Sequence, residues 1–187
     1  MTDSRLDRAR ARLRETGTAA LFVGPSPDLR WLVGYEALPL ERLTLLVVPA
    51  DGEATLVVPE LEVPRAEDSG AGDQVAIRAF DELADPFDLV ADAMGDADRD
   101  GRMAVQDRLW TMFLLRLQDR FPSASWTGSG PITGHLRLRK TPDEIAALAR
   151  VGEAIDAVHA QVPGLLRPGR TLSLIHISEP TRRTPIS

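Results

Sequence analysis

The 187-residue chain contains no cysteine, and no stretch of it is apolar for long enough to span a membrane. Without cysteine there is no disulfide framework, no thiolate metal site and no thiol nucleophile. The N-terminal segment MTDSRLDRARARLRETG mixes acids with arginines and lacks the apolar core of a signal peptide. These absences lead us to expect a soluble, cytoplasmic protein.

Positive charge is also scarce, because 22 Lys and Arg stand against 28 Asp and Glu, giving a net charge of −6. An acidic chain is poorly suited to a nucleic-acid backbone or an anionic membrane, so neither is expected as a partner. The excess is concentrated in residues 51–100, which hold 15 acidic residues and three arginines. That concentration predicts a solvated acidic face.

Motifs that identify a reaction are missing as well. Gly24, which follows an apolar run, is followed by proline rather than by a glycine-rich phosphate loop, and no nucleophile elbow occurs. The three histidines, His135, His159 and His176, have no neighbouring ligand at the spacing of a metal site. Each is therefore expected to be a surface or core-edge side chain. No catalytic, cofactor-binding or metal-binding residue is assigned.

One acidic stretch does resemble a metal-binding loop. DADRDGRMAVQD places Asp96, Asp98, Asp100 and Gly101 where an EF-hand carries its first calcium ligands and its glycine. Its last position is Asp107, where the motif needs a longer, bidentate glutamate. The segment GRMAVQD also has the pattern of a strand that leaves a polar turn, and we favour that interpretation over calcium binding.

The order of apolar patterns predicts a mixed α/β sandwich. Leu6, Ala9 and Leu13 recur at helical spacing, AALFVGPSP is typical of a buried strand, and Asp51-Gly52 between two apolar runs predicts a β-hairpin. The remaining expected elements are a helix from Asp85-Pro86 to about Met94, a strand at GRMAVQD, a helix lined by Trp110, Phe113, Leu114, Leu117 and Phe121, and a short strand near SASWTG.

Glycines at 128, 130 and 134 indicate a boundary, after which a new helix is expected. Thr141 and Glu144 form the pattern of a capping box. The apolar stripe of this helix repeats at spacings of three and four until Pro163-Gly164, and it comprises Leu148, Val151, Ile155, Val158 and Val162. Little chain remains to cover the stripe, so we expect it to be exposed.

Taken in order, these segments resemble the N-terminal part of the creatinase, prolidase and aminopeptidase P family. The resemblance rests on RLDRARARLRETG, PSPDLRWLVGY, LLVVPADGEATLVVP and GRMAVQD, and above all on LRLRKTPDEIAALARVGEAIDAVH. The last stretch is similar to the family's hinge, with basic Arg137, Arg139 and Lys140 before the capped Thr141. The similarity covers nearly all of residues 1–171.

The resemblance implies a metal-dependent Xaa-Pro aminopeptidase or dipeptidase. Its N-terminal domain would serve oligomerisation and shape the substrate entrance, so a second copy of the chain is an implied partner and a Xaa-Pro peptide the implied substrate. Its "pita-bread" domain would hold two divalent metals, manganese, cobalt or zinc, on two aspartates, a histidine and two glutamates. Those ligands lie downstream of the helix that begins near Thr141, so this chain itself is expected to be inactive.

Two alternatives remain open at this point. A creatinase-type amidinohydrolase, which cleaves a guanidino substrate without metal, has the same N-terminal architecture. A non-catalytic binding or assembly module of that architecture is the other.

Together with the resemblance, the observations predict a creatinase N-terminal-like α/β domain over residues 1–130, a hinge over 131–140 and the start of a truncated catalytic domain over 141–171.

The last residues, 172–187, resemble something else. LSLIHISEPTR, from Leu172 to Arg182, matches codon for codon a translated transposon-end sequencing adapter. We therefore expect an artefactual, disordered tail that follows a cut at Thr171. The alternative is a real tail that binds a partner through Leu172, Leu174, Ile175 and Ile177.

Overall fold

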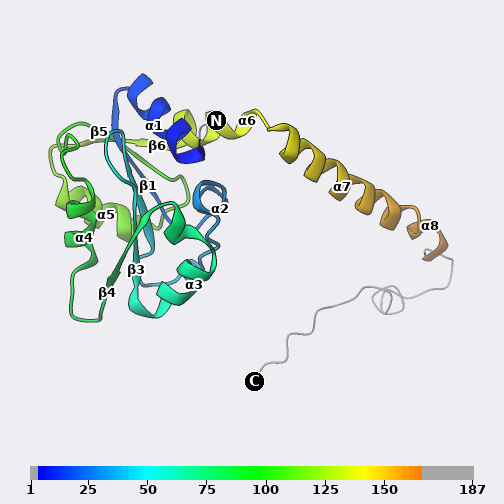
Figure 1. Cartoon of the computed structure of the whole chain (residues 1–187), viewed down its shortest axis with the longest axis horizontal. Helices are drawn as coiled ribbons and strands as arrows, with labels where there is room; N and C mark the ends of the chain where they lie inside the picture. The colour runs from blue at the N-terminus through cyan, green and yellow to red at the C-terminus, as the bar shows by residue number, and fades with distance from the viewer. Residues whose placement is uncertain (1–3, 166–187) are drawn as a thin grey trace. The chain divides into compact units, whose positions relative to one another are not determined.

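The structure is a computed structural model that describes residues 4–165 (Figure 1). The chain divides into two compact units, Met1–Arg139 and Lys140–Ser187. None of the described helices is long and apolar enough to cross a bilayer. The predictions made for Leu172 to Arg182 and for His176 lie outside the described residues.

A six-stranded mixed sheet forms the centre of the first unit, in the order β4-β3-β2-β1-β5-β6. Its strands are β1 Thr18–Val23, β2 Leu45–Pro49, β3 Thr55–Pro59, β4 Ala76–Phe80, β5 Arg102–Val105 and β6 Ser125–Gly128. Only β2 runs antiparallel to its neighbours β1 and β3, and the other pairs are parallel. The other five strands therefore end at one edge of the sheet, where β2 begins, and we call it the carboxyl edge.

Helices cover both faces of this sheet (Figure 1). They are α1 Arg5–Glu15, α2 Pro27–Val33, α3 Val63–Asp68, α4 Pro86–Ala93, α5 Thr111–Arg120 and α6 His135–Leu138, with the shorter turns η1 Glu60–Glu62, η2 Ala71–Asp73 and η3 Gly130–Gly134. Residues of α1 to α3 pack on one face, and residues of α4 and α5 pack on the other. The α/β sandwich expected from the sequence is confirmed.

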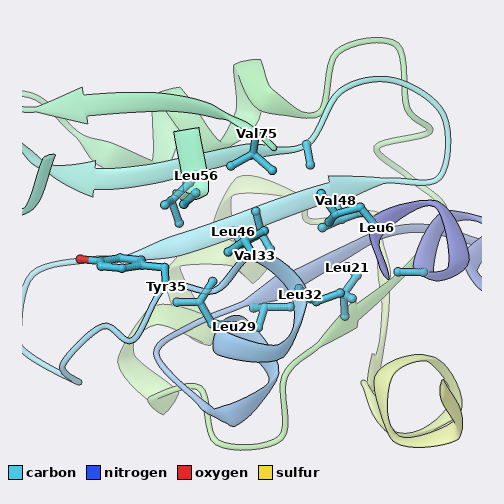
Figure 2. Close-up of a cluster of buried hydrophobic side chains, with 14 of the residues drawn as sticks. Leu6, Leu21, Leu29, Leu32, Val33, Tyr35, Leu46, Val48, Leu56 and Val75 are labelled. Carbon is cyan, nitrogen blue, oxygen red and sulfur yellow. The ribbon is translucent and has the colours of Figure 1, made fainter. Parts of the chain in front are cut away.

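Successive residues of β1 divide between the two cores because side chains alternate along a strand. Leu21 and Val23 belong to the first core cluster together with side chains of α1 and α2. Figure 2 shows Leu21 in this cluster with Leu6 and Leu29. Phe22 points to the other face, where its ring centroid lies 6.1 Å from that of Phe121. A strand buried on both faces has no polar positions, which accounts for the continuous apolar run in the sequence.

Most elements begin where the sequence indicates. The hairpin of β2 and β3 encloses Gly52, whose φ of 111° suits glycine. Asp85 caps α4 by accepting the Phe87 N–H at 3.0 Å, with Pro86 at the first helical position.

Several short elements were not predicted, among them α2, α3 and β4. The first two span only seven and six residues, too few for a helical period to be recognised. β4 is an edge strand whose side chains are mostly exposed, so it lacks an apolar run. The prediction that Trp110 and Phe121 belong to a helix is wrong, because both residues flank α5.

The first unit ends at Arg139, which lies within the hinge expected over residues 131–140. In this segment, the carbonyl of Pro131 accepts an N–H from Arg12 Nε at 2.9 Å. Arg137, which the resemblance placed in a hinge, forms an ion pair with Asp28 of α2. Residues up to 139 therefore pack as part of the α/β unit.

The second unit is described as far as residue 165 and contains α7 Pro142–His159 and α8 Val162–Leu165. The predicted capping box is confirmed, since Thr141 Oγ1 accepts the Glu144 N–H at 3.3 Å and the Glu144 carboxylate accepts the Thr141 N–H at 3.0 Å. Within α7 the predicted stripe is exposed, with Leu148, Val151, Ile155 and Val158 each leaving about half of their surface to solvent.

Candidate functional site

The carboxyl edge of the sheet gathers loops from several parts of the chain. Residues 34–44 lead into β2, η1 follows β3, residues 81–85 follow β4, and residues 106–110 follow β5. In sheets with parallel strands, this edge is where ligand sites and specialised loops usually lie. We therefore take it as the candidate functional region of the first unit.

A cleft of about 480 Å³ opens at this edge, which is within the size range of small-molecule and peptide-side-chain sites. Its apolar floor comprises Leu43, Phe80, Phe87, Met112 and Phe113. Its charged rim comprises Glu41, Arg42, Glu60, Asp81, Glu82 and Arg116. An apolar floor within a charged rim suits an apolar side chain that is surrounded by polar groups.

Two ion pairs fix the rim. Arg42, just before β2, pairs with Glu82 after β4. Arg116 of α5 lies 2.6 Å from Asp85, the cap of α4, and its guanidinium carbon lies 4.6 Å above the Phe87 ring. Each pair joins two segments distant in sequence, and three of the four residues, Arg42, Glu82 and Arg116, line the cleft.

The turn after β4 carries the most exposed large apolar side chain of the described residues. Asp81 Oδ1 accepts N–H bonds from both Leu83 and Ala84, each at 2.9 Å, which fixes the backbone of the turn. The Leu83 side chain is nonetheless 95% exposed. A single exposed apolar side chain is ordinary on a protein surface, so Leu83 by itself does not identify a binding site. In the sequence, Leu83 is a lone leucine in the acidic stretch 81–85, and this position was not predicted to be an exposed apolar side chain.

A second, smaller depression lies beside the cleft and shares Phe113 with it. Leu40, Leu109 and Trp110 line this depression together with Gly24. A Cβ atom on Gly24 would lie 2.7 Å from the end of the Leu109 side chain, so a larger residue there would require Leu109 to shift. The two depressions form one continuous surface, which we call the carboxyl-edge face.

Tyr35 connects the first core to this edge. The tyrosine is buried, and its hydroxyl, at the far left of Figure 2, donates to Glu62 Oε2 at 2.9 Å. Burial of the ring and the adjacent Glu62 carboxylate both raise the pKa of the Tyr35 hydroxyl well above its usual value. Tyr35 is thus a neutral hydrogen-bond donor at neutral pH rather than a proton-transfer group.

Asp28 at the start of α2 forms a second polar centre. Its carboxylate accepts a hydrogen bond from Thr133 Oγ1 at 2.8 Å and pairs with Arg137. The Asp28 side chain is only 14% exposed, so its charge is satisfied mainly by protein groups. These contacts join α2 to the segment that closes the first unit, which indicates a structural role.

The acidic stretch with EF-hand spacing does not form a calcium loop. Asp98 Oδ1 accepts the backbone N–H of Asp100 at 3.0 Å, which makes a local turn. Strand β5 then carries the chain away, and Asp107 lies at the strand's far end, where it accepts the Ser129 N–H at 3.1 Å. The favoured interpretation of a turn followed by a strand is confirmed.

Of the described histidines, His135 begins α6 in the first unit and His159 ends α7 in the second, and both are exposed. Over residues 4–165 no three His, Asp or Glu side chains are grouped so that they could hold a metal ion. The residues described here therefore do not fit a metal centre, and no reaction step is derived through one.

Comparison with known proteins places these features in a family. The family profile of the creatinase/prolidase N-terminal domain matches residues 5–139, the same span as the α/β unit. A probable dipeptidase, PepE, of Mycobacterium tuberculosis is 37% identical over 169 residues, which cover 89% of this chain and 44% of the relative. The chain thus spans less than half the length of that curated relative.

Solved structures show the same relationship. Dipeptidase PepE of Mycobacterium ulcerans superposes with a TM-score of 0.82 at 40% identity, over 91% of this chain and 46% of that one. A proline dipeptidase structure from Streptococcus pneumoniae gives a TM-score of 0.64 at 26% identity, over 74% of this chain and 100% of that one. A chain that consists of this domain alone is therefore able to fold.

Proposed function

Because the chain belongs to the creatinase/prolidase N-terminal domain family, we propose that it is the N-terminal part of a metal-dependent peptidase that acts on Xaa-Pro bonds. The observation that carries this proposal is the 37% identity with a probable dipeptidase over nearly the whole of this chain. The name of the Streptococcus pneumoniae relative, a proline dipeptidase, supports the choice of peptide bond.

In the proposed full-length enzyme the catalytic metals lie outside this chain. Two divalent ions, manganese, cobalt or zinc, would be held by two aspartates, a histidine and two glutamates of the downstream domain. There they would generate a nucleophile and polarise the scissile carbonyl. Residues 141–171 are the beginning of that domain, and α7 is its first helix.

The role of the α/β unit in this proposal is assembly and shaping of the substrate entrance. Its charged cleft and several exposed apolar side chains, such as Leu61 and Leu83, lie at the carboxyl edge. A cytoplasmic location suits the absence of cysteine from the sequence.

An activity assay tests the proposal directly. The purified chain is incubated with manganese and a Xaa-Pro dipeptide, and the released proline is measured. We expect no turnover above a buffer control, because the metal ligands belong to sequence that the chain lacks. Turnover that a chelator abolishes would contradict this expectation, and it would place a metal site within the chain itself.

A non-catalytic assembly module is the second candidate function. The exposed carboxyl-edge face favours it, because a module needs a surface for a partner and no active site. The coding sequence downstream of Thr171 separates the candidates: all five metal ligands there would establish a metallopeptidase, and an intact domain without them would establish a module. A creatinase-type amidinohydrolase would be recognised by hydrolysis of a guanidino substrate without metal.

A further inference from the structure

Both positive charges that line the cleft at the carboxyl edge are already paired within the chain. Arg42 forms an ion pair with Glu82. Arg116 forms an ion pair with Asp85, and its guanidinium lies over the Phe87 ring. An anionic ligand would have to compete with a carboxylate for either arginine. The cleft is therefore poorly suited to a carboxylate or phosphate ligand.

Negative charge is in excess at the same cleft. Its lining includes the carboxylates of Glu41, Glu60, Asp81 and Glu82. Glu82 is paired with Arg42, and Asp81 Oδ1 accepts two N–H groups of its own turn. Among the residues that the structure describes, the carboxylates of Glu41 and Glu60 have no hydrogen-bond or ion-pair partner. Two negative charges are thus available to a ligand.

The floor of the cleft is suited to the apolar part of such a ligand. It includes the rings of Phe80, Phe87 and Phe113. The face of an aromatic ring attracts a cation, and Arg116 already uses the Phe87 ring in this way, with its guanidinium carbon 4.6 Å from the ring centroid. The other two rings offer apolar surface beside the carboxylates.

Charge and size together narrow the class of ligand. A neutral apolar ligand would remove water from the two glutamates without giving them a partner, which costs free energy. A ligand that carries a positive charge on an apolar body avoids this cost. The volume of about 480 Å³ is that of a small-molecule site.

We propose that the cleft binds a small organic cation, an ammonium or guanidinium group carried on an aromatic or branched apolar body. The apolar body lies on the floor at Phe80 and Phe113, and the positive group faces Glu41 and Glu60. All of these residues belong to the α/β unit. The inference goes beyond the proposed peptidase, because it needs neither metal ions nor the downstream domain.

Titration of the full chain with phenethylammonium, followed by NMR of the amide and indole N–H groups, tests the proposal. Trp110 stacks on Phe113 with a centroid distance of 6.0 Å, so its indole signal should shift. The amide signals of Leu83 and Ala84, in the turn beside the cleft, should shift with it. Trp31 packs against the other face of the sheet, and its indole signal should stay in place.

Uncharged and anionic analogues of the same probe test the role of charge. Phenethyl alcohol has the same apolar body and should bind roughly fivefold more weakly or worse, because it gives the glutamates no ionic partner. Hydrocinnamate should bind no better than the alcohol. Equal dissociation constants for the amine and the alcohol would overturn the proposal. Shifts confined to α7 would overturn it as well, because they would place the amine on the exposed apolar stripe.

Glu41→Gln and Glu60→Gln locate the charge that binds the amine. Each variant keeps the shape of the side chain and should raise the dissociation constant roughly twofold to fivefold, the range of an exposed ion pair. Glu53→Gln is the matched control, since Glu53 is also exposed but lies in the hairpin between β2 and β3, at the opposite edge of the sheet. It should leave the constant unchanged. Circular dichroism verifies that the variants are folded.

Two further results would refute this site. An equal loss of affinity in all three variants would show that only the net charge of the chain attracts the amine. No shift of Trp110, Leu83 or Ala84 at millimolar amine would show that the cleft does not bind it. Neither result would affect the peptidase proposal, which depends on metal ligands outside the cleft.

Discussion

The sequence patterns place both Leu21 and Leu148 on an apolar face, but the two side chains differ in their exposure to solvent. Leu21 is 0% exposed in the centre of the sheet, whereas Leu148 is 58% exposed on α7. Helices of the first unit cover both faces of its sheet, whereas no comparable layer covers the apolar stripe of α7 within residues 4–165. Periodicity therefore specifies which face of an element is apolar, and only the rest of the fold specifies what covers it.

The largest difference between the two units should appear when one leucine is shortened in each. Leu21→Ala is expected to lower the free energy of unfolding by about 2–5 kcal/mol, because it leaves a cavity in a packed core. Leu148→Ala should not lower it, because the side chain is exposed and alanine favours helix. Urea unfolding followed by tryptophan fluorescence measures both. Equal losses would show that the α7 stripe is covered.

A smaller loss of stability is expected when the contacts between α2 and the last residues of the first unit are removed. Asp28→Ala removes the acceptor of Thr133 and the partner of Arg137, and it should cost about 1.5–3 kcal/mol. Asp28→Asn, which preserves the shape and one hydrogen bond, should cost less. The same urea titration compares them. If Asp28→Ala were neutral, the contacts of Asp28 with Thr133 and Arg137 would contribute nothing to the stability of the unit.

The Tyr35 hydroxyl should make the first unit sensitive to alkali. Burial and Glu62 raise the pKa of Tyr35 in the folded state. The hydroxyl therefore contributes fully to stability below its pKa in the unfolded chain, about 10, and this contribution decreases as the pH rises above that value. Tyr35 is the only tyrosine, so phenolate absorbance reports this group alone. We expect phenolate to appear only with unfolding.

Tyr35→Phe is the matched control for that titration. It should lower stability at neutral pH by about 1 kcal/mol through the lost hydrogen bond to Glu62. It should also remove the part of the stability loss at alkaline pH that comes from ionisation of Tyr35. Phenolate that formed reversibly near pH 10 in the folded protein would contradict a buried, carboxylate-paired hydroxyl.

The smallest effect on stability, close to zero, is expected when the second unit is removed. Deletion of residues 141–187 leaves the whole α/β unit in place, so its free energy of unfolding should not change. Solubility should improve, because the exposed stripe is lost. Leu148→Glu with Ile155→Glu in the full chain should reproduce the improvement. A deletion that lowered solubility would show that the stripe is not the cause of association.

The sequence predicted well those features that depend on local pattern. The two-sided burial of β1, the hairpin around Gly52 and the capping box at Thr141 follow from residues adjacent in the chain, and each is confirmed. The family was recognisable from the same segments taken in order.

Features that depend on distant residues were not predictable in this way. The edge strand β4 exists because β3 supplies hydrogen-bond partners, and its own residues give little signal. The cleft arises where Arg42, Glu82 and Arg116 meet from three separate segments. The exposed position of Leu83 likewise depends on a turn held by Asp81. Such a turn leaves no periodic pattern of apolar residues in the sequence.

The pairing of Asp28 with Arg137 has a consequence for how the protein is made. The two residues are 109 positions apart, so α2 leaves the ribosome long before its partner is synthesised. Strands β5 and β6, which complete the sheet beside β1, also arrive late. Contacts so distant in sequence slow folding and leave the early half of the nascent chain exposed in the meantime. The α/β unit is therefore expected to fold late, when residues 130–139 emerge, and the early half of the chain should expose apolar surface until then.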